Sequence, residues 1–201
     1  MPADGRPTSL PFVLGATQAA ALLEKLQRRH IWVVGDLILD ETIGGQVDRV
    51  SPEAPVPVVL VNEEKATLGG AGNAAHGIVA LGGKVSLCGR LGDDVAGRAF
   101  LDVATAAGID VAAVDVVSGM STVRKVRVLG NDQQVVRLDW EIKAFHDNAD
   151  RMFSKLADRG QPDAILISDY GKGSVTRALC ARLVSHAKKL NIPVVVDPKQ
   201  R

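Results

Sequence analysis

The sequence is poor in aromatic residues, has two cysteines and carries almost no net charge, and each shortage argues against a class of protein. Phe, Trp and Tyr make up 3% of the 201 residues, whereas hydrophobic residues make up 46%. Aliphatic cores of this kind are typical of α/β enzymes whose central strands are buried on both faces. A net charge of +1 provides no field that would attract nucleic acid or a membrane surface. No apolar run reaches the roughly 18 residues that a membrane span needs.

The cysteines and histidines show no spacing typical of a metal site. Cys88 and Cys180 lie in apolar or helical patterns, so we expect free thiols in a reducing cytosol and a cytoplasmic protein. The histidines have neither metal-ligand spacing nor a nucleophile beside them: His30, His76, His146 and His186. Residues 1–15 lack the basic and apolar segments of a signal peptide. We expect a loose arm there, followed by a helix over residues 17–29 with Thr17 as its N-cap.

Short apolar runs alternate with helical patterns along most of the chain. Strands are expected at residues 30–35, 84–89, 111–117, 164–168 and 194–197. Helices are expected at residues 73–81, 94–107, 148–158 and 175–190. This alternation predicts βαβ units, right-handed crossovers and a mainly parallel sheet, which is an α/β fold.

Two segments interrupt this alternation. Residues 41–61 are rich in Gly, Val and Pro and have no helical period. Residues 122–139 form a β-hairpin pattern, with Gly130-Asn131-Asp132 as the turn between two half-polar strands. Together they predict a small separate sheet inserted into the α/β body. Such a sheet would serve as a lid over a site or as a dimer interface.

The most informative motif is a small-residue loop that runs into an apolar helix, Gly69-Gly70-Ala71-Gly72-Asn73. Glycines let a ligand approach main-chain N–H groups, and the first turn of the helix adds free N–H donors. Asp36, at the end of the first strand, would accept hydrogen bonds from hydroxyl groups. These features favour a small, oxygen-rich ligand.

The same glycines also satisfy a dinucleotide-binding pattern, Gly70-x-Gly72-x-x-Ala75. That pattern requires the loop to follow a strand directly. The preceding apolar run ends near Val61, and charged residues 62–65 intervene. We therefore favour a sugar-binding site over a dinucleotide-binding oxidoreductase.

Charged residues follow three of the expected strands, where ligands bind in open α/β sheets. Asp36 and Asp40 follow the first strand, and Asp197 and Lys199 the last. Between them, Lys172 is flanked by glycines after the strand at 164–168, so it is free to reach a phosphate. A turn aspartate and a surface lysine are the alternative interpretations.

The hairpin adds a second group of cations. Lys125 and Arg127 lie two residues apart and share one strand face, and Arg137 is a further candidate. They would either clamp a phosphate or protect an exposed sheet edge from pairing with another chain. The sequence leaves both interpretations open.

Taken together, these motifs resemble the ribokinase (PfkB) family of sugar kinases. The family pattern is carried by residues 69–74, by Gly35-Asp36 and by Gly89-x-x-Gly92-Asp93-Asp94. Within the family, the chain is most similar to heptose-7-phosphate kinases. That similarity rests on segments 49–58, 133–139, 168–173 and 197–199, and it extends from about His30 to the end.

The resemblance implies a ribokinase-like three-layer α/β sandwich with a β lid at about residues 41–61 and 122–139, and a homodimer formed through the lid. It implies ATP and Mg²⁺ as cofactors and phosphorylation of D-glycero-D-manno-heptose 7-phosphate at O1, a step toward lipopolysaccharide core. The implied substrate-binding residues are Asp36, Asp40, Gly69, Gly70, Asn73, Lys125, Arg127, Gln134 and Lys172. Lys199 is a candidate for nucleotide binding, and no metal ligand is expected.

The chain departs from the family in one respect. The family's catalytic base lies in a Gly-Ala-Gly-Asp segment, which does not occur after Gly72, so we expect the base to lie beyond Arg201. We therefore expect residues 1–29 to be an arm and helix, and residues 30–201 to be the N-terminal portion of a kinase domain without its base. A kinase for another phosphosugar or nucleoside, and a non-catalytic sugar-phosphate-binding fragment, are the alternatives.

Overall fold

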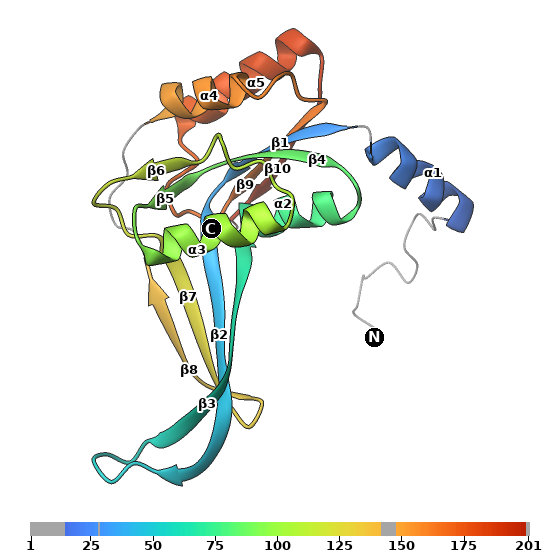
Figure 1. Ribbon diagram of the computed structural model, residues 1–201. Helices are drawn as coiled ribbons and strands as arrows, with labels where there is room; N and C mark the ends of the chain where they lie inside the picture. Colours follow the sequence, from blue (N-terminus) through green and yellow to red (C-terminus); the bar gives the residue numbers. More distant parts are fainter. Residues whose placement is uncertain (1–14, 28, 142–147, 200–201) are drawn as a thin grey trace, which may run out of the picture.

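The computed structural model describes residues 15–27, 29–141 and 148–199. Nearly all of the expected N-terminal arm lies outside these ranges, as do His146 and Arg201, so the expectation of a base beyond Arg201 stays a prediction. The described residues form an α/β body from which a long β-sheet projects (Figure 1). Helix α1 (Ala16–Leu26) lies to one side of the body and buries none of its residues. It begins after Gly15 as N-cap, so the expectation that Thr17 caps a helix over residues 17–29 is wrong.

A parallel four-stranded sheet forms the centre of the body, with the strand order β10-β9-β1-β4. Every neighbouring pair in it is parallel, which confirms the expected sheet type. Its strands are β1 (His30–Gly35), β4 (Lys84–Cys88), β9 (Ala164–Asp169) and β10 (Val194–Pro198). The carboxyl ends of β1, β9 and β10 therefore lie side by side, as their charged residues predicted.

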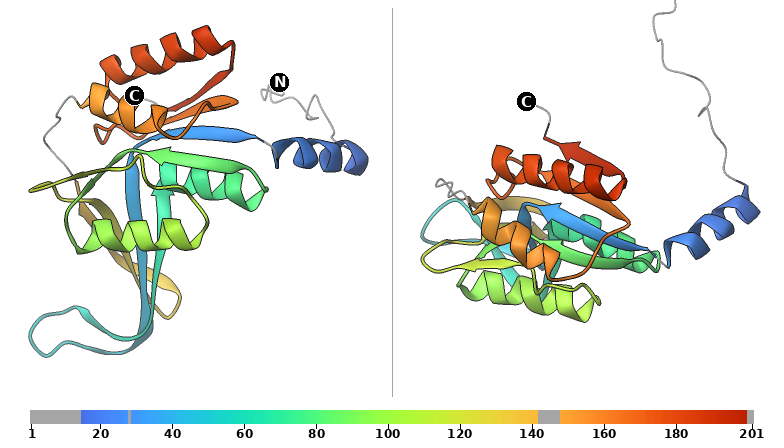
Figure 2. Two further views of the ribbon diagram at one scale, coloured as in Figure 1. Left: turned by 45° about the horizontal axis from the view of Figure 1, so that its top comes forward. Right: turned by 90° about the horizontal axis from the view of Figure 1, so that it is seen from above.

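Helices cover both faces of this sheet and complete the expected three layers (Figures 1 and 2). One face packs against α2 (Ala71–Ala80) and α3 (Val95–Ala106), and the other against α4 (Ala149–Ala157) and α5 (Arg177–Leu190). Trp32 and Val33 are neighbours on β1 and serve different faces. Val33 packs in the cluster with Phe100 of α3, and Trp32 packs in the cluster with Leu183 of α5. Strand alternation thus builds two cores from one strand.

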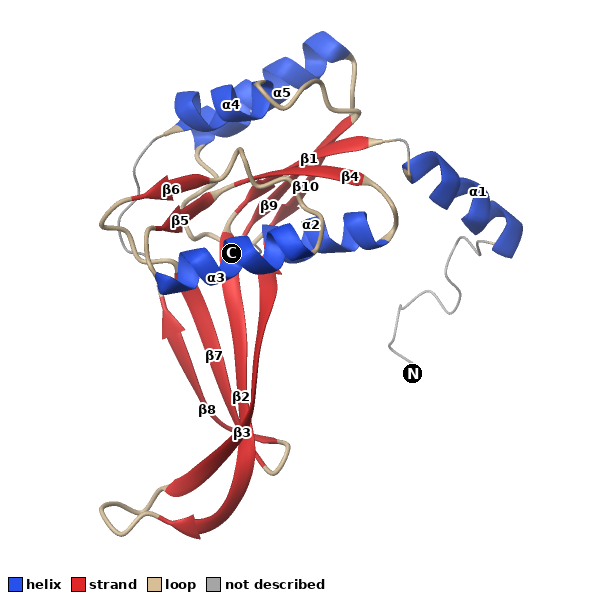
Figure 3. Ribbon diagram, viewed as in Figure 1, coloured by secondary structure: helices blue, strands red, loops and turns tan. Residues whose placement is uncertain are grey.

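The two segments without helical period form a second sheet with the strand order β3-β2-β7-β8, called here the projecting sheet (Figure 3). Its strands are β2 (Leu37–Val50), β3 (Pro57–Gly70), β7 (Val123–Gly130) and β8 (Gln133–Trp140). Asn131 and Asp132 have φ values of 49° and 64°, as a two-residue hairpin turn requires. The expected hairpin is confirmed.

Strand β3 corrects one premise of the sequence analysis. Residues 62–65 are expected to interrupt the chain before the glycine motif, but they lie within β3, which runs directly into α2. Residues 63–65 pair with residues 42–44 of β2 and are exposed, so charge does not end the strand. The dinucleotide interpretation still fails, because β3 is an antiparallel strand of the projecting sheet.

The strand expected at residues 111–117 is also shorter than predicted. Only β6 (Asp115–Val117) is extended, and it pairs with β5 (Arg90–Gly92) in a separate two-stranded sheet. The Val114 N–H donates to the Val111 carbonyl, and Asp110 accepts from the Ala112 N–H. These local bonds fold residues 110–114 into a turn, because aspartate offers the backbone a competing partner.

Candidate functional site

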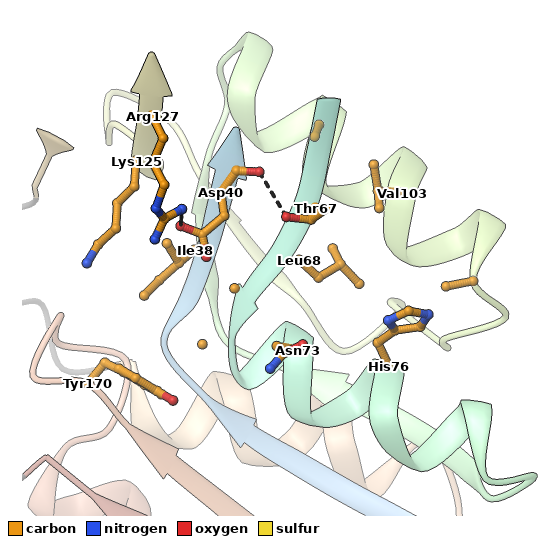
Figure 4. A pocket seen from close by; sticks show the side chains of 14 residues that line it. Ile38, Asp40, Thr67, Leu68, Asn73, His76, Val103, Lys125, Arg127 and Tyr170 are labelled. Carbon is orange, nitrogen blue, oxygen red and sulfur yellow. Dashed lines mark hydrogen bonds and ion pairs between the residues drawn. The ribbon is translucent and has the colours of Figure 1, made fainter. Parts of the chain in front are cut away.

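A pocket of about 620 Å³ lies where the projecting sheet joins the body (Figure 4). Strands β2, β3 and β7, helices α2 and α3, and the loop after β9 all contribute to its wall. The lining residues are Ile38, Asp40, Ala66, Thr67, Leu68, Gly69, Gly70, Asn73, His76, Val103, Ala107, Lys125, Arg127 and Tyr170. The glycine motif and the hairpin cations, which are far apart in the sequence, therefore meet at one site.

Gly69 and Gly70 are the positions at which the wall cannot carry a side chain. A Cβ on Gly69 would lie 2.4 Å from Oδ2 of Asp40, and one on Gly70 would lie 2.2 Å from the Asp36 carbonyl oxygen. Gly70 also has a φ of 57°, which allows β3 to turn directly into α2. The two glycines thus keep the floor of the pocket open beside a carboxylate.

Asp40 is the acidic residue among the described residues that line the pocket. Its Oδ1 lies 3.2 Å from Nη1 of Arg127, and its main-chain carbonyl accepts a hydrogen bond from Thr67 Oγ1 at 3.2 Å (Figure 4). The position of Oδ2 over Gly69 leaves that oxygen at the pocket floor. A carboxylate placed in this way can accept hydrogen bonds from the hydroxyl groups of a ligand.

Lys125 and Arg127 both line the pocket, as expected for residues that share one face of β7. Within the described ranges, the Lys125 ammonium has no hydrogen bond or ion pair closer than 4 Å. The pocket therefore combines one carboxylate with two cations. Such a set of charges suits a polyol that carries an anionic group.

Helix α2 supplies Asn73 and also a residue that the sequence analysis set aside. Asn73 was expected at the site, whereas His76 was assigned no function, yet both line the pocket. They lie three positions apart, so they share one face of the helix. The three-residue spacing from Asn73 is thus the signal that could have identified His76. Thr67 and Tyr170 were missed as well, although both adjoin motifs that had been singled out.

Asp36 lies outside the pocket lining, which departs from its expected role as a ligand acceptor. Its side chain is 0% exposed and does not line the pocket. Oδ2 accepts hydrogen bonds from the N–H groups of Tyr170 and Lys172 at 2.8 and 2.9 Å, and Oδ1 accepts one from the N–H of Ser174 at 2.8 Å. A carboxylate at the end of a strand is expected to accept hydrogen bonds from a ligand. Here both oxygens of Asp36 already accept hydrogen bonds from main-chain N–H groups of the loop after β9. Asp36 holds the loop that carries Tyr170 into the pocket.

Three further candidates also lie outside the pocket lining. The Lys172 ammonium is 2.5 Å from Oε1 of Glu141, so its charge is already paired. Gln134 pairs with Leu129 near the hairpin turn and is exposed. Lys199 is exposed, and its N–H donates to the Asp169 carbonyl at 2.7 Å. The structure thus places Lys172, Gln134 and Lys199 outside the lining that Asp40 and the glycine motif share.

No group of three metal-ligating side chains occurs among the residues that the structure describes. Cys88 and Cys180 are free thiols, and burial raises the pKa of Cys88 to about 12. Across the described parts of the chain, no helix is long and apolar enough to cross a membrane.

The sequence from residue 28 to residue 201 matches the pfkB family of carbohydrate kinases, and the chain belongs to this family. Among curated relatives, it is 39% identical to the bifunctional protein HldE of Wolinella succinogenes over 183 residues, which are 90% of this chain and 39% of that protein. It is 44% identical to HldE of Geobacter sulfurreducens over 170 residues, which are 83% of this chain and 35% of that protein. The chain thus spans less than half the length of these relatives.

Solved structures confirm the ribokinase-like fold. A ribokinase of Arabidopsis thaliana complexed with ribose and ATP aligns with a TM-score of 0.58 at 16% identity, over 86% of this chain and 54% of that one. Phosphofructokinase-2 of Escherichia coli in complex with fructose-6-phosphate aligns with a TM-score of 0.60 at 17% identity, over 87% and 55%. The chain covers about half of each structure.

Proposed function

We propose that this chain forms the sugar-phosphate-binding part of an ATP-dependent kinase that phosphorylates D-glycero-D-manno-heptose 7-phosphate at O1. The product would be the 1,7-bisphosphate, an intermediate on the way to ADP-heptose and lipopolysaccharide core. One observation carries the proposal: the pocket places the Asp40 carboxylate beside Lys125 and Arg127. The heptose assignment rests on the resemblance of segments 49–58 and 133–139, and the identity with the HldE proteins supports it.

Each part of the pocket has a role in this proposal. Asp40 and Asn73 would bind sugar hydroxyls, while Gly69 and Gly70 would let the sugar approach the main chain closely. The cations would bind the 7-phosphate and so place the other end of the sugar for reaction. Binding of this kind positions the acceptor hydroxyl, which is a large part of what phosphoryl transfer requires of a protein.

ATP would supply the transferred phosphoryl group, with Mg²⁺ neutralising part of its charge. In the described ranges, no side-chain cluster suits a metal, and Lys199 is the candidate for contact with the nucleotide. Its side chain lies against Gly171 at the carboxyl edge of the body sheet. We assign the catalytic base to none of the 201 residues and place it, as a proposal, in sequence beyond Arg201. The cytoplasm, where ATP is available, is the proposed location.

Calorimetric titration of the chain with a panel of sugars tests the binding proposal. We expect heptose 7-phosphate to bind more tightly than fructose 6-phosphate, ribose or unphosphorylated heptose. Tighter binding of another phosphosugar or of a nucleoside would instead support a kinase of different specificity. In a separate assay, the chain alone should produce no bisphosphate from ATP, whereas the enzyme encoded by the intact gene should. Steady product formation by the chain alone would contradict the assignment of the base.

We further propose that the projecting sheet closes over the sugar and pairs two copies of the chain. Val136 and Leu138 pair with Val128 and Val126, so they share a sheet face that differs from that of Lys125. Both are exposed, as is Trp140. Exposed apolar residues gathered on one sheet face favour association. In sedimentation, we expect the wild-type chain to form a dimer and the Leu138→Lys variant to be a monomer, because the charge would be buried in the interface. A wild-type chain that sediments as a monomer would contradict the pairing.

A further inference from the structure

The pocket contains an ion pair between two of its own binding groups. Oδ1 of Asp40 and Nη1 of Arg127 are 3.2 Å apart, and their side chains are 25% and 40% exposed. Asp40 belongs to β2 and Arg127 to β7, two parallel neighbours in the projecting sheet. Figure 4 shows the pair facing the pocket above Tyr170. The carboxylate of the pocket is therefore paired with one of its two cations.

This arrangement creates a competition for Asp40. A neutral sugar that uses the acceptor site of Asp40 facing Arg127 has to displace the guanidinium, and a cation holds a carboxylate oxygen more strongly than a hydroxyl does. A sugar with a phosphate offers the guanidinium a better partner, because the planar fork of arginine matches phosphate geometry. A neutral sugar therefore binds while Arg127 still holds Asp40, whereas a phosphosugar binds with Arg127 on its phosphate and Asp40 released.

We propose that Arg127 exchanges between Asp40 and the phosphate of the substrate, and that this exchange makes the pocket selective for phosphorylated sugars. The proposal rests on the proposed function and adds the physical basis of its specificity. When Arg127 moves to the phosphate, both oxygens of Asp40 become available to sugar hydroxyls. Binding of the anion and binding of the hydroxyls therefore reinforce each other.

The environment of the pair makes such an exchange feasible. Partly exposed ion pairs contribute little net free energy, because water screens both charges. Breaking the pair therefore takes little from the binding of a phosphosugar. Lys125, which also lines the pocket and has no ion pair in the described ranges, remains as a second cation for the phosphate. The charges needed to receive a dianion are present before Arg127 moves.

The test compares the affinities of two ligands, heptose 7-phosphate and unphosphorylated heptose, by calorimetry. Arg127→Met keeps the aliphatic stem but removes the guanidinium. We expect it to weaken heptose 7-phosphate binding by about tenfold or more, because a charged hydrogen bond is lost. We expect the same change to tighten heptose binding by up to about fivefold, because Asp40 is then free. Effects of opposite sign on two ligands cannot come from a general loss of structure.

The neighbouring strand position offers a matched control. Arg124 and Glu41 form a second ion pair between the same two strands, with similar exposures of 34% and 23%. Neither residue lines the pocket, since they lie on the other face of the strands. Arg124→Met therefore removes an equivalent cation without touching the site. Both affinities should stay at the wild-type values.

Inorganic phosphate gives a second measurement on the unmodified chain. Added phosphate should draw Arg127 from Asp40 and increase the affinity for heptose, and it should have no such effect on Arg127→Met. The exchange is overturned if Arg127→Met leaves heptose binding unchanged or weakens it, even when heptose 7-phosphate still binds the wild type. If the wild type binds neither ligand, the proposed function itself fails.

Discussion

The ammonium of Lys172 lies 2.5 Å from a carboxylate oxygen of Glu141, which joins the loop after β9 to the residue that follows β8. The hydrogen bond from Lys172, together with its charge, lowers the pKa of Glu141 below its ordinary value. This ion pair connects the body with the projecting sheet. It also explains why a lysine between two glycines is not left free for a ligand.

Replacing Lys172 should therefore affect stability slightly and ligand binding hardly at all. Half of the Glu141 side chain is exposed, so solvent screens the pair, and we expect Lys172→Gln to lower the free energy of unfolding by about 0.2–1 kcal/mol. Urea unfolding and titration with heptose 7-phosphate measure the two effects. A tenfold loss of phosphosugar affinity in a stable variant would instead indicate that Lys172 binds the phosphate.

Asp36→Asn should disturb the fold more than the chemistry of the pocket. An amide offers one oxygen and places an NH₂ group against main-chain donors, so at least one hydrogen bond from residues 170–174 is lost. For a fully buried carboxylate we expect a cost of about 2–4 kcal/mol in the free energy of unfolding. Thermal and urea unfolding measure it. Unchanged stability combined with weakened sugar binding would show that Asp36 contacts the ligand after all.

Gly69→Ala should impair binding because the new methyl group would occupy the space of Oδ2 of Asp40. The carboxylate has to rotate away, and we expect a loss of at least about tenfold in affinity for heptose 7-phosphate. Gly77→Ala is a suitable control, because a Cβ there meets no atom within 4 Å. It lies in the interior of α2 and should stabilise the protein by about 0.5–1 kcal/mol while leaving affinity unchanged. Equal affinities for both variants would contradict the role of Gly69.

Asp94 should make stability depend on pH in the acid range. Burial would raise its pKa, but hydrogen bonds from the N–H and hydroxyl of Thr122 and from the Gly97 N–H outweigh burial, so the pKa lies below its ordinary value. Between the folded and unfolded pKa values the unfolded chain binds more protons, so stability falls as the pH is lowered through this window. Urea unfolding from neutral pH to roughly pH 3 measures the effect. The difference between the wild type and Asp94→Asn should shrink below about pH 4, and a constant difference would contradict it.

The sequence predicted the layers of the fold well because each layer has its own periodicity. Buried runs such as residues 30–35 and the helical pattern at 175–190 identify their elements without tertiary information. The prediction at residues 62–65 was wrong because a charged segment indicates a loop only where a strand at that place would be buried. In the projecting sheet both faces of β3 are exposed at this point, and nothing in the local sequence announces that exposure.

The site was predicted in part for the same reason. Gly69, Gly70 and Asn73 are contiguous with a helix start, so their roles are local and can be read from the sequence. Whether Asp36 or Asp40 faces the pocket depends on donors from residues 170–174, more than 130 positions away. The engagement of Lys172 with Glu141 depends on where β8 ends relative to β9. Such competition between distant partners has no local signal.

The projecting sheet is attached to the body at one end and extends freely from it at the other. A single residue, Asp36, separates β1 from β2, and its N–H, carbonyl and carboxylate are all bonded to the body. The first irregularity in the pairing of β2 with β3 comes later, between Gly44 and Gly45. We therefore expect the sheet to flex beyond Gly44. Asp40 and Arg127 lie on the body side of that point, so we expect movement of the outer end to leave their spacing unchanged.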